Sequence, residues 1–219
     1  MSETIYALYP CFKASPSFSD LDADDAAQDV ENLFKAWDGV NVRGVYSTFG
    51  FRADTDLMLW LVGPSADALQ EALVSFGRTE AGRLLELSWS FMGVVKPAEF
   101  TRDHSPAFVR GEPPKRYLSV YPFVRTTEWY LLPPEERSAL LSEHGQIGRE
   151  FPDVLANTTS AFGIGDWEWI LAFEADELDR IVECIRRLRE AEARRFTKEE
   201  VPFVTGIRKD ARAAFADLG

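Results

Sequence analysis

The sequence has little cysteine, no long hydrophobic run and few positive charges. Its 219 residues include two cysteines, Cys11 and Cys184, too few for a disulfide framework or a thiolate metal cluster, which fits a reducing compartment. The apolar stretches fall well short of the roughly 20 residues that a membrane-spanning helix needs. Residues 1–13 lack the flanks of a signal peptide. We therefore expect a soluble, cytoplasmic protein that does not contact membranes.

The charge balance also argues against nucleic-acid binding. The chain has 24 Lys and Arg against 36 Asp and Glu, a formal net charge of −12, so it repels polyanions. An anionic ligand would need a local basic pocket. With 46% hydrophobic residues the chain can bury a substantial core in one or two domains.

Hydrophobic periodicity predicts a mixture of strands and helices in two similar halves. Strands are predicted at residues 4–12, 41–51, 56–62, 84–95, 117–124, 154–163, 167–173 and 201–207, and helices at 24–37, 65–76, 134–149 and 176–195. Local similarity between the halves, at an offset of about 110 residues, indicates an internal duplication. We predict an α+β fold of two tandem ferredoxin-like βαββαβ units that form a dimeric-type α+β barrel.

The composition divides the chain into three parts. An N-terminal half spans residues 1–95 and a C-terminal half spans residues 116–219. The intervening residues 96–115 contain four prolines and charges of both signs, which is typical of a connector. A loop of this length in a compact protein is either functional or disordered, and this one contains His104.

The second of the two histidines, His144, lies at the edge of the buried face of the helix predicted at 134–149. One interpretation is a core histidine bonded to a carbonyl, and the other is a metal ligand. Gly145 and Gly148 flank it, and each costs about 1 kcal/mol of helix stability relative to alanine. Either they permit tight packing on the sheet, or a large flat ligand such as a porphyrin approaches here with His144 as its axial ligand.

Other chemistry has little support in the sequence. The chain contains no HExxH, CxxC or GxSxG motif, so zinc sites and a hydrolytic triad are disfavoured. Gly163-Ile164-Gly165 lacks the third glycine and the following helix of a dinucleotide-binding fingerprint. This segment is predicted to be a hairpin turn.

Five motifs follow one another in the second half: YPFVR at residues 121–125, EWYLL at 128–132, EHGQIGR at 143–149, FPDVLANT at 151–158 and GDWEWILAFEADEL at 165–178. In order and spacing the chain resembles the chlorite dismutase family, and within it the coproheme decarboxylases of the actinobacterial type. The resemblance covers nearly the whole chain. It also places the haem-binding site in the C-terminal half.

The resemblance implies roles for the main site residues. His144 matches the proximal iron ligand, and Tyr121 matches a tyrosine whose radical attacks a propionate. Arg125 occupies a basic position that contacts a propionate. His104 sits where the actinobacterial type has a distal histidine, which would act as the base that deprotonates peroxide.

Further residues would surround the porphyrin. Trp129 and Trp169 match aromatic residues beside the ring, Arg194 matches a position near a propionate, and Arg149 is an additional candidate cation. Chlorite dismutases have a distal arginine about 13 residues after the proximal histidine. Asn157 holds that position here, which disfavours chlorite cleavage.

The implied activity is the decarboxylation of two propionates of coproheme III (Fe-coproporphyrin III) by hydrogen peroxide, through harderoheme III to haem b. Coproheme would be both substrate and redox centre. The alternatives are a chlorite dismutase or haem peroxidase on the same fold, and a non-catalytic haem-binding protein. The resemblance also implies a homopentamer that receives coproheme from a coproporphyrin ferrochelatase.

Overall fold

The computed structural model of the protein describes residues 4–95 and 105–219. His104 and the preceding part of the predicted connector lie outside the described residues. The chain divides into two units, one formed by residues 1–95 with 204–219 and the other by residues 96–203. The first boundary coincides with the end of the predicted N-terminal half. The last 16 residues group with the first unit, although the sequence analysis assigned them to the C-terminal half.

The first unit is built on an antiparallel sheet of five strands. They are β1 (Tyr6–Ala14), β2 (Asn41–Arg52), β3 (Thr55–Gly63), β4 (Leu85–Val94) and β9 (Val204–Lys209). Strand β1 pairs with β3 and β4, and β2 pairs with β3 and β9. The order β4-β1-β3-β2 is that of a ferredoxin-like unit. Strand β9 adds to its edge, which explains why the C-terminal residues group with this unit.

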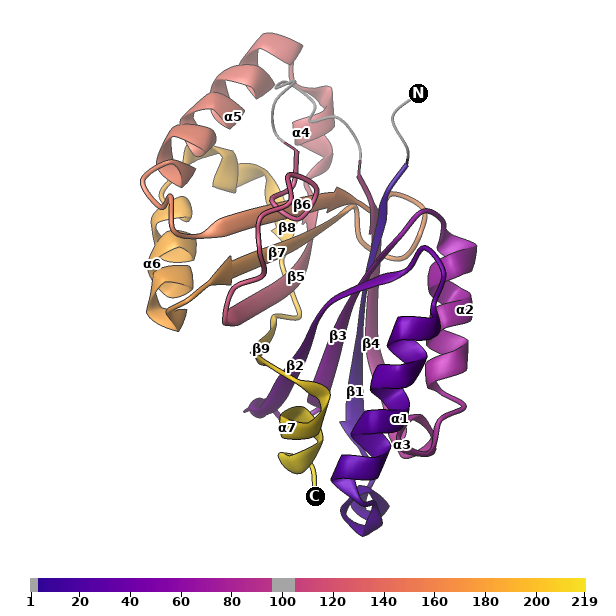
Figure 1. The fold of residues 1–219 in the computed structure, drawn as a ribbon. Helices are drawn as coiled ribbons and strands as arrows, with labels where there is room; N and C mark the ends of the chain where they lie inside the picture. The colour runs from indigo at the N-terminus through magenta and orange to yellow at the C-terminus, as the bar shows by residue number, and fades with distance from the viewer. Residues whose placement is uncertain (1–3, 96–104) are drawn as a thin grey trace. The chain divides into compact units, whose positions relative to one another are not determined.

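Helices cover one face of this sheet (Figure 1). They are α1 (Ala23–Ala36), α2 (Ala66–Phe76) and the shorter α3 (Glu80–Arg83), α7 (Ala211–Ala216) and η1 (Pro16–Asp20). Asp22 caps α1, and the Ser65 hydroxyl accepts the Ala68 N–H of α2 at 3.1 Å, as expected of an N-cap. Val30 and Leu69 pack with Leu61 in the core of this unit.

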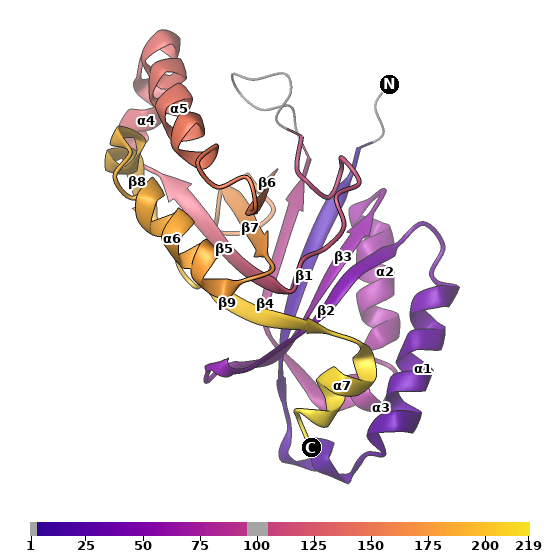
Figure 2. The same ribbon diagram turned by 60° about the vertical axis from the view of Figure 1, so that its left-hand side comes forward.

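The second unit contains a sheet with β7 (Trp169–Ala175) between β5 (Tyr117–Arg125) and β6 (Leu155–Ser160). The short strand β8 (Thr197–Glu199) pairs with the end of β5. Its helices are α4 (Thr127–Leu131), α5 (Pro134–Gly148), α6 (Leu178–Leu188) and η2 (Glu192–Phe196). Helix α6 runs along this sheet (Figure 2). Its Ile181 joins Tyr121 and Phe173 in one hydrophobic cluster.

The α+β class and the βαββαβ order of elements are confirmed. The helix predicted at 176–195 is shorter, because α6 ends at Leu188 and η2 follows. The predicted turn at Gly163 is confirmed, with a positive φ of 74° at this glycine and an Ile164 N–H to Ala161 O hydrogen bond of 3.0 Å. No helix among the described residues has the length and apolar character needed to cross a bilayer.

Candidate functional site

One face of the second sheet gathers three of the predicted site residues. Alternate residues of a strand share a face, so Tyr121 and Arg125 of β5 lie on the same side. Phe123 lies between Tyr121 and Arg125 in β5 and points to the same side. Trp169 of β7 is its partner in the register, so Trp169 also lies on this face. We call the side of the sheet that carries Tyr121, Arg125 and Trp169 the site face.

The guanidinium of Arg125 is held by several groups at the end of β5. Its carbon Cζ lies 4.1 Å from the centre of the Trp129 ring and 4.9 Å from that of Phe123. Its Nη1 donates a hydrogen bond of 2.9 Å to the carbonyl of Ala193 in η2. Arg125 is half-buried, and these contacts hold its planar guanidinium in a fixed orientation, the geometry in which arginine binds a carboxylate.

Trp129 connects the same region to η2. Although α4 has only five residues, its Trp129 side chain is 2% exposed and its ring lies 5.7 Å from that of Phe196. Helix η2 also contains Arg194, whose Nη1 lies 2.7 Å from Glu200 Oε2. Glu200 pairs with Arg189 as well. Arg194 is therefore already in an ion pair, and a bound carboxylate would share it with Glu200.

Tyr121 lies beneath this cluster in an aromatic environment. Its ring stacks on Phe203 at 4.3 Å and meets Phe173 edge-on at 6.0 Å. Burial raises the pKa of Tyr121, as does the charge of Glu200, whereas the nearby arginines lower it. The phenol consequently keeps its proton, and it makes no hydrogen bond to any residue in the described part of the chain.

His144 lies on a helix that is poorly covered by protein. Of the 15 residues of α5, all of them described, only Ile147 is fully buried. Burial lowers the pKa of the half-buried His144, and the charge of Arg125 lowers it further, against the opposing effect of Glu143. The imidazole is therefore neutral at pH 7. It makes no hydrogen bond to any described residue, so the interpretation as a carbonyl-bonded core histidine is not supported.

The glycines beside His144 face open space. A Cβ atom built on Gly145 would have Arg149 Nη1 at 3.9 Å as its neighbour, and one on Gly148 would have no described atom within 4 Å. By contrast, a Cβ on Gly206 would lie 2.9 Å from that of Tyr46. Tight packing on the sheet therefore does not explain Gly145 and Gly148. A neutral imidazole on a helix with open glycines fits a flat macrocycle and its metal.

Arg149 is the predicted cation with the weakest structural connection to this cluster. It follows α5 as its C-cap and is exposed. Its side chain makes no hydrogen bond or ion pair with a described residue. The structure thus brings Tyr121, Arg125, Trp129 and Arg194 close to η2, and leaves Arg149 at the rim of the glycine-flanked helix end.

Asn157 does not lie on the site face. It is 1% exposed, its Nδ2 donates at 3.1 Å to both Ala172 O and Glu174 Oε1, and its Oδ1 accepts the Phe108 N–H at 2.9 Å. The register of β6 places Ala156 and Thr158 on the site face instead. The choice of position 157 as the place of a distal arginine therefore needs correction, although neither residue that replaces it is an arginine.

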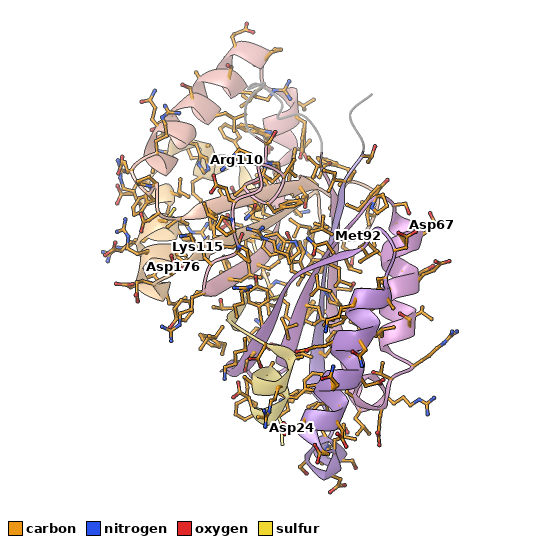
Figure 3. All side chains as sticks on the ribbon, viewed as in Figure 1. Asp24, Asp67, Met92, Arg110, Lys115 and Asp176 are labelled. Atoms are coloured by element: carbon orange, nitrogen blue, oxygen red, sulfur yellow. The ribbon has the colours of Figure 1, made fainter. Side chains whose placement is uncertain are left out.

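Asn157 and Glu174 instead anchor the segment that enters the second unit. Glu174 is 0% exposed and its Oε2 accepts the Lys115 N–H at 3.2 Å. Lys115 Nζ also lies 2.8 Å from Oδ2 of Asp176, the residue that follows β7. Figure 3 labels both residues. The end of the predicted connector is thus fixed to β6 and β7 by a buried polar network.

Two residues of the site, Tyr130 and Glu168, were missed by the sequence analysis. Glu168, just before β7, accepts the Arg125 N–H at 2.8 Å and the Tyr130 hydroxyl at 2.5 Å through the same oxygen, Oε2. Tyr130 belongs to the motif EWYLL, and Glu168 belongs to the motif GDWEWILAFEADEL. The available signal was their position next to Trp129 and Trp169, but a contact between residues 38 positions apart cannot be seen in local spacing.

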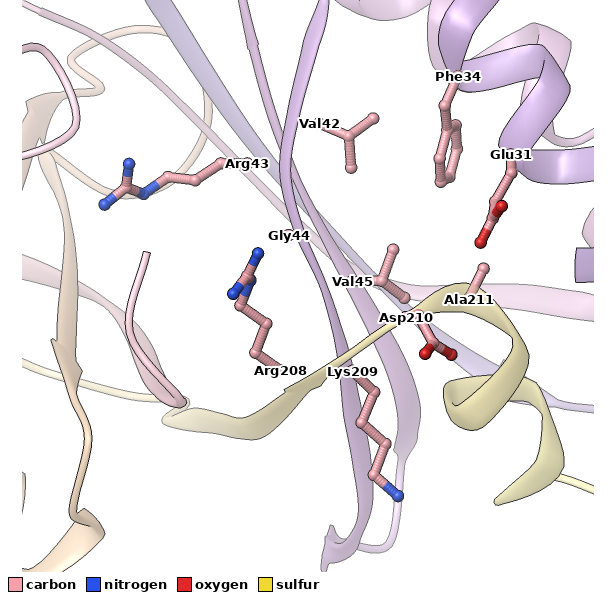
Figure 4. A pocket seen from close by; sticks show the side chains of 10 residues that line it. All are labelled: Glu31, Phe34, Val42, Arg43, Gly44, Val45, Arg208, Lys209, Asp210 and Ala211. Carbon is pink, nitrogen blue, oxygen red and sulfur yellow. The ribbon is translucent and has the colours of Figure 1, made fainter. Parts of the chain in front are cut away.

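The first unit contains a separate cavity of about 220 Å³, where Glu31 and Phe34 of α1 face Val42 of β2 (Figure 4). Ligand pockets usually measure about 300–1,000 Å³, so this cavity is too small for a porphyrin. It also contains none of the predicted site residues. We therefore locate the candidate site in the second unit.

Comparisons with known proteins identify the family of the chain. The model of the family described as Chlorite dismutase matches residues 23–209. A coproheme decarboxylase of Mycolicibacterium smegmatis is 47% identical over 97% of this chain and 94% of its own, and one of Thermus thermophilus is 28% identical over 90% and 85%.

Solved structures show the same fold. A chlorite dismutase variant from Candidatus Nitrospira defluvii superimposes with a TM-score of 0.87 at 22% identity, covering 100% of this chain and 96% of that one. The enzyme from that organism in complex with imidazole gives a TM-score of 0.85 at 22% identity, covering 98% and 94%. From the extent of the family match and the 47% identical relative, we conclude that the chain belongs to the chlorite dismutase family.

Proposed function

We propose that this protein is a coproheme decarboxylase, which uses hydrogen peroxide to convert two propionates of coproheme III to vinyl groups, through harderoheme III, and releases haem b. The relative with 47% identity over nearly the whole chain is named for this activity. The observation that carries the proposal is the neutral, unbonded imidazole of His144 beside the open space over Gly145 and Gly148.

The overall reaction is balanced without another cofactor. Each propionate, R–CH₂CH₂–COO⁻, reacts with one hydrogen peroxide and one proton to give R–CH=CH₂, carbon dioxide and two waters. The substrate iron supplies the redox chemistry when it is bound. The protein has to hold the iron, orient the propionates and supply a group that removes hydrogen from the β-carbon.

Each of these tasks has a candidate on or beside the site face. His144 would bind the iron through its neutral nitrogen. Arg125, held against Trp129, would orient a propionate, with Arg194 and Arg149 as further cations. Tyr121 would lose its hydroxyl hydrogen and abstract the propionate hydrogen, because its phenol is protonated and has no other described partner. Trp129 and Trp169 would border the ring.

His104 remains the predicted distal base. A histidine with a pKa near 6.5 can accept the first proton of peroxide at neutral pH. The other proposals are that the protein works in the cytoplasm as a homopentamer and receives its substrate from a coproporphyrin ferrochelatase. Measuring the mass of the purified protein in solution tests the pentamer.

The decisive experiment is a titration of the protein loaded with iron coproporphyrin III. Hydrogen peroxide is added stepwise and the porphyrin masses are followed. Two successive losses of one formic-acid equivalent are expected. Absence of any loss would support a haem-binding protein without catalysis, and oxygen release from chlorite would support a chlorite-degrading enzyme instead.

The variant His144→Ala tests the iron ligand separately. It should change the Soret spectrum of bound ferric coproheme, and added imidazole should restore part of it. An unchanged spectrum would contradict the assignment of His144. The variant Ser142→Ala, which alters an exposed residue of the same helix with no proposed contact to the substrate, is the matched control for folding.

A further inference from the structure

A second tyrosine in the site region is bonded to a carboxylate. The Tyr130 hydroxyl donates a hydrogen bond to Glu168 Oε2 at 2.5 Å. Tyr130 is half-buried, with its ring edge-on to that of the exposed Phe162 at 6.0 Å. Tyr121, the tyrosine of the proposed reaction, has no such carboxylate partner among the described residues.

This geometry favours the loss of an electron from Tyr130. A phenol that loses an electron becomes strongly acidic, so oxidation is easiest where a base already accepts the hydroxyl hydrogen bond. Glu168 is such a base, held in place by the Arg125 N–H at 2.8 Å. Burial and Glu168 together raise the pKa of Tyr130, so that the phenol is protonated before any oxidation.

An aromatic connection leads from Tyr130 to the site face. The Phe162 ring lies edge-on to that of Trp169 at 5.4 Å, as it does to that of Tyr130, and Trp169 pairs with Phe123 in the β5–β7 register. The next pair on the same face is Tyr121 with Leu171. Trp169 therefore lies one side-chain position from Tyr121 along the sheet, and its indole can relay an electron from Tyr130 toward a bound porphyrin.

We propose that Tyr130 is a second redox-active tyrosine, which is oxidised when hydrogen peroxide reacts at a site that holds no cleavable propionate, and that Glu168 takes its proton. Peroxide removes two electrons from the site. Tyr130–OH and Glu168–COO⁻ then give Tyr130–O•, Glu168–COOH and one electron, which reduces the oxidised porphyrin by one step. A soluble one-electron donor such as ascorbate regenerates Tyr130. The inference rests on the proposed peroxide-dependent function.

In the complex with haem b, the oxidation of Tyr130 can be followed without decarboxylation, because haem b has already lost the two propionates that are cleaved. Protein loaded with haem b is mixed with hydrogen peroxide, frozen rapidly and examined by electron paramagnetic resonance. The wild type should show a tyrosyl signal that ascorbate removes. Tyr130→Phe should lose this signal. Tyr117→Phe, which removes a partly buried phenol of β5, should keep it.

Glu168→Gln gives a second variant in which Tyr130 is retained. Glutamine still accepts the Arg125 N–H but is not a base, so the tyrosyl yield should fall although Tyr130 is present. A full signal in Tyr130→Phe would overturn the inference, as would a full signal in Glu168→Gln. If wild-type protein loaded with coproheme yields no decarboxylated product, it is the proposed function that fails; normal product with an unchanged radical in the variants refutes only the role of Tyr130.

Discussion

The guanidinium of Arg125 lies 4.1 Å from the centre of the Trp129 ring, and its Nη1 is bonded to Ala193 O. The planar group is thus fixed in one orientation before any substrate binds. Lysine would keep the charge but lose the stacking and the fork of donors. Replacing Arg125 by lysine therefore tests the effect of the orientation of this group separately from the effect of its positive charge.

We expect Arg125→Lys to weaken coproheme binding by about 10-fold or more, because hydrogen bonds to charged groups contribute about 1.5–3 kcal/mol. Fluorescence quenching titrations with coproheme and with haem b measure the effect. Arg116→Lys is the control, since Arg116 lies 5.3 Å from the Tyr117 ring and outside the cluster at η2. Equal affinities of wild type and Arg125→Lys would contradict the propionate contact.

Gly145→Ala should separate stability from substrate binding. Alanine stabilises a helix by about 1 kcal/mol relative to glycine, and the new Cβ meets only Arg149 Nη1 at 3.9 Å. The thermal midpoint of the empty protein should therefore rise, while coproheme binds more weakly. Gly148→Ala should behave similarly.

Gly206→Ala provides the contrast, because its Cβ would lie 2.9 Å from Tyr46 Cβ in the first unit. This variant should lower the thermal midpoint through steric strain. If Gly145→Ala instead destabilised the empty protein and left coproheme binding intact, the open space beside His144 would not be the substrate site.

Tyr121→Phe should bind coproheme normally and lose decarboxylation. Phenylalanine preserves the stacking on Phe203 at 4.3 Å and removes only the hydroxyl that is proposed to abstract hydrogen. Soret titration measures binding, and mass spectrometry after peroxide addition measures product. Tyr117→Phe controls for loss of a phenol from the same strand. Normal yields of harderoheme and haem b in Tyr121→Phe would exclude Tyr121 as the abstracting group.

Asn157→Arg should destabilise the protein without creating chlorite activity. Asn157 faces away from the site face and makes hydrogen bonds to Phe108, Ala172 and Glu174. Arginine there would break a buried network, which costs about 2 kcal/mol or more. Urea unfolding measures the loss, and an oxygen electrode measures chlorite cleavage. Oxygen release by this variant would show that residue 157 reaches the substrate iron.

The hairpin that joins β2 and β3 should contribute a pH-dependent part of the stability. Hydrogen bonds from Arg52 and Trp89 hold the pKa of Asp54 well below its usual range, mainly through Arg52. This contribution is present above pH 4 and is lost as the pH falls toward the lowered pKa.

Asp54→Asn should therefore cost about 1 kcal/mol at pH 7, a modest value because the pair is partly exposed. The difference from wild type should shrink below pH 4. Asp38→Asn, at an exposed position, should show no comparable loss. A difference that persists unchanged at pH 2 would show that the charge of Asp54 is not its cause.

Long amphipathic elements were predictable from the sequence because many residues repeat one pattern. Residues 24–37 and 65–76 were predicted within one or two residues of α1 and α2. Strand β8, with three residues, and α4, with five, are too short to show a period. The grouping of β9 with the first unit depends on its pairing with β2, a long-range contact that spacing does not encode.

Site residues that belong to motifs could be predicted from the sequence. Site residues that depend on strand register or on tertiary contacts could not. Tyr121, Arg125 and Trp169 share a face because strand residues alternate, which the motif YPFVR already suggests. Asn157 was chosen by counting from His144, and an error of one position in a strand places a side chain on the opposite face. The role of Glu168 could be seen only in the fold, since its two partners, Arg125 and Tyr130, come from β5 and α4.

Helix α5 has one fully buried side chain, Ile147, along its whole length. A bound tetrapyrrole would provide the apolar wall that the polypeptide does not. We expect amide hydrogen exchange in residues 134–148 to slow on loading, and the empty form to be the preferred target of cellular proteases. The amount of enzyme in a cell would then follow the supply of the pigment that it processes.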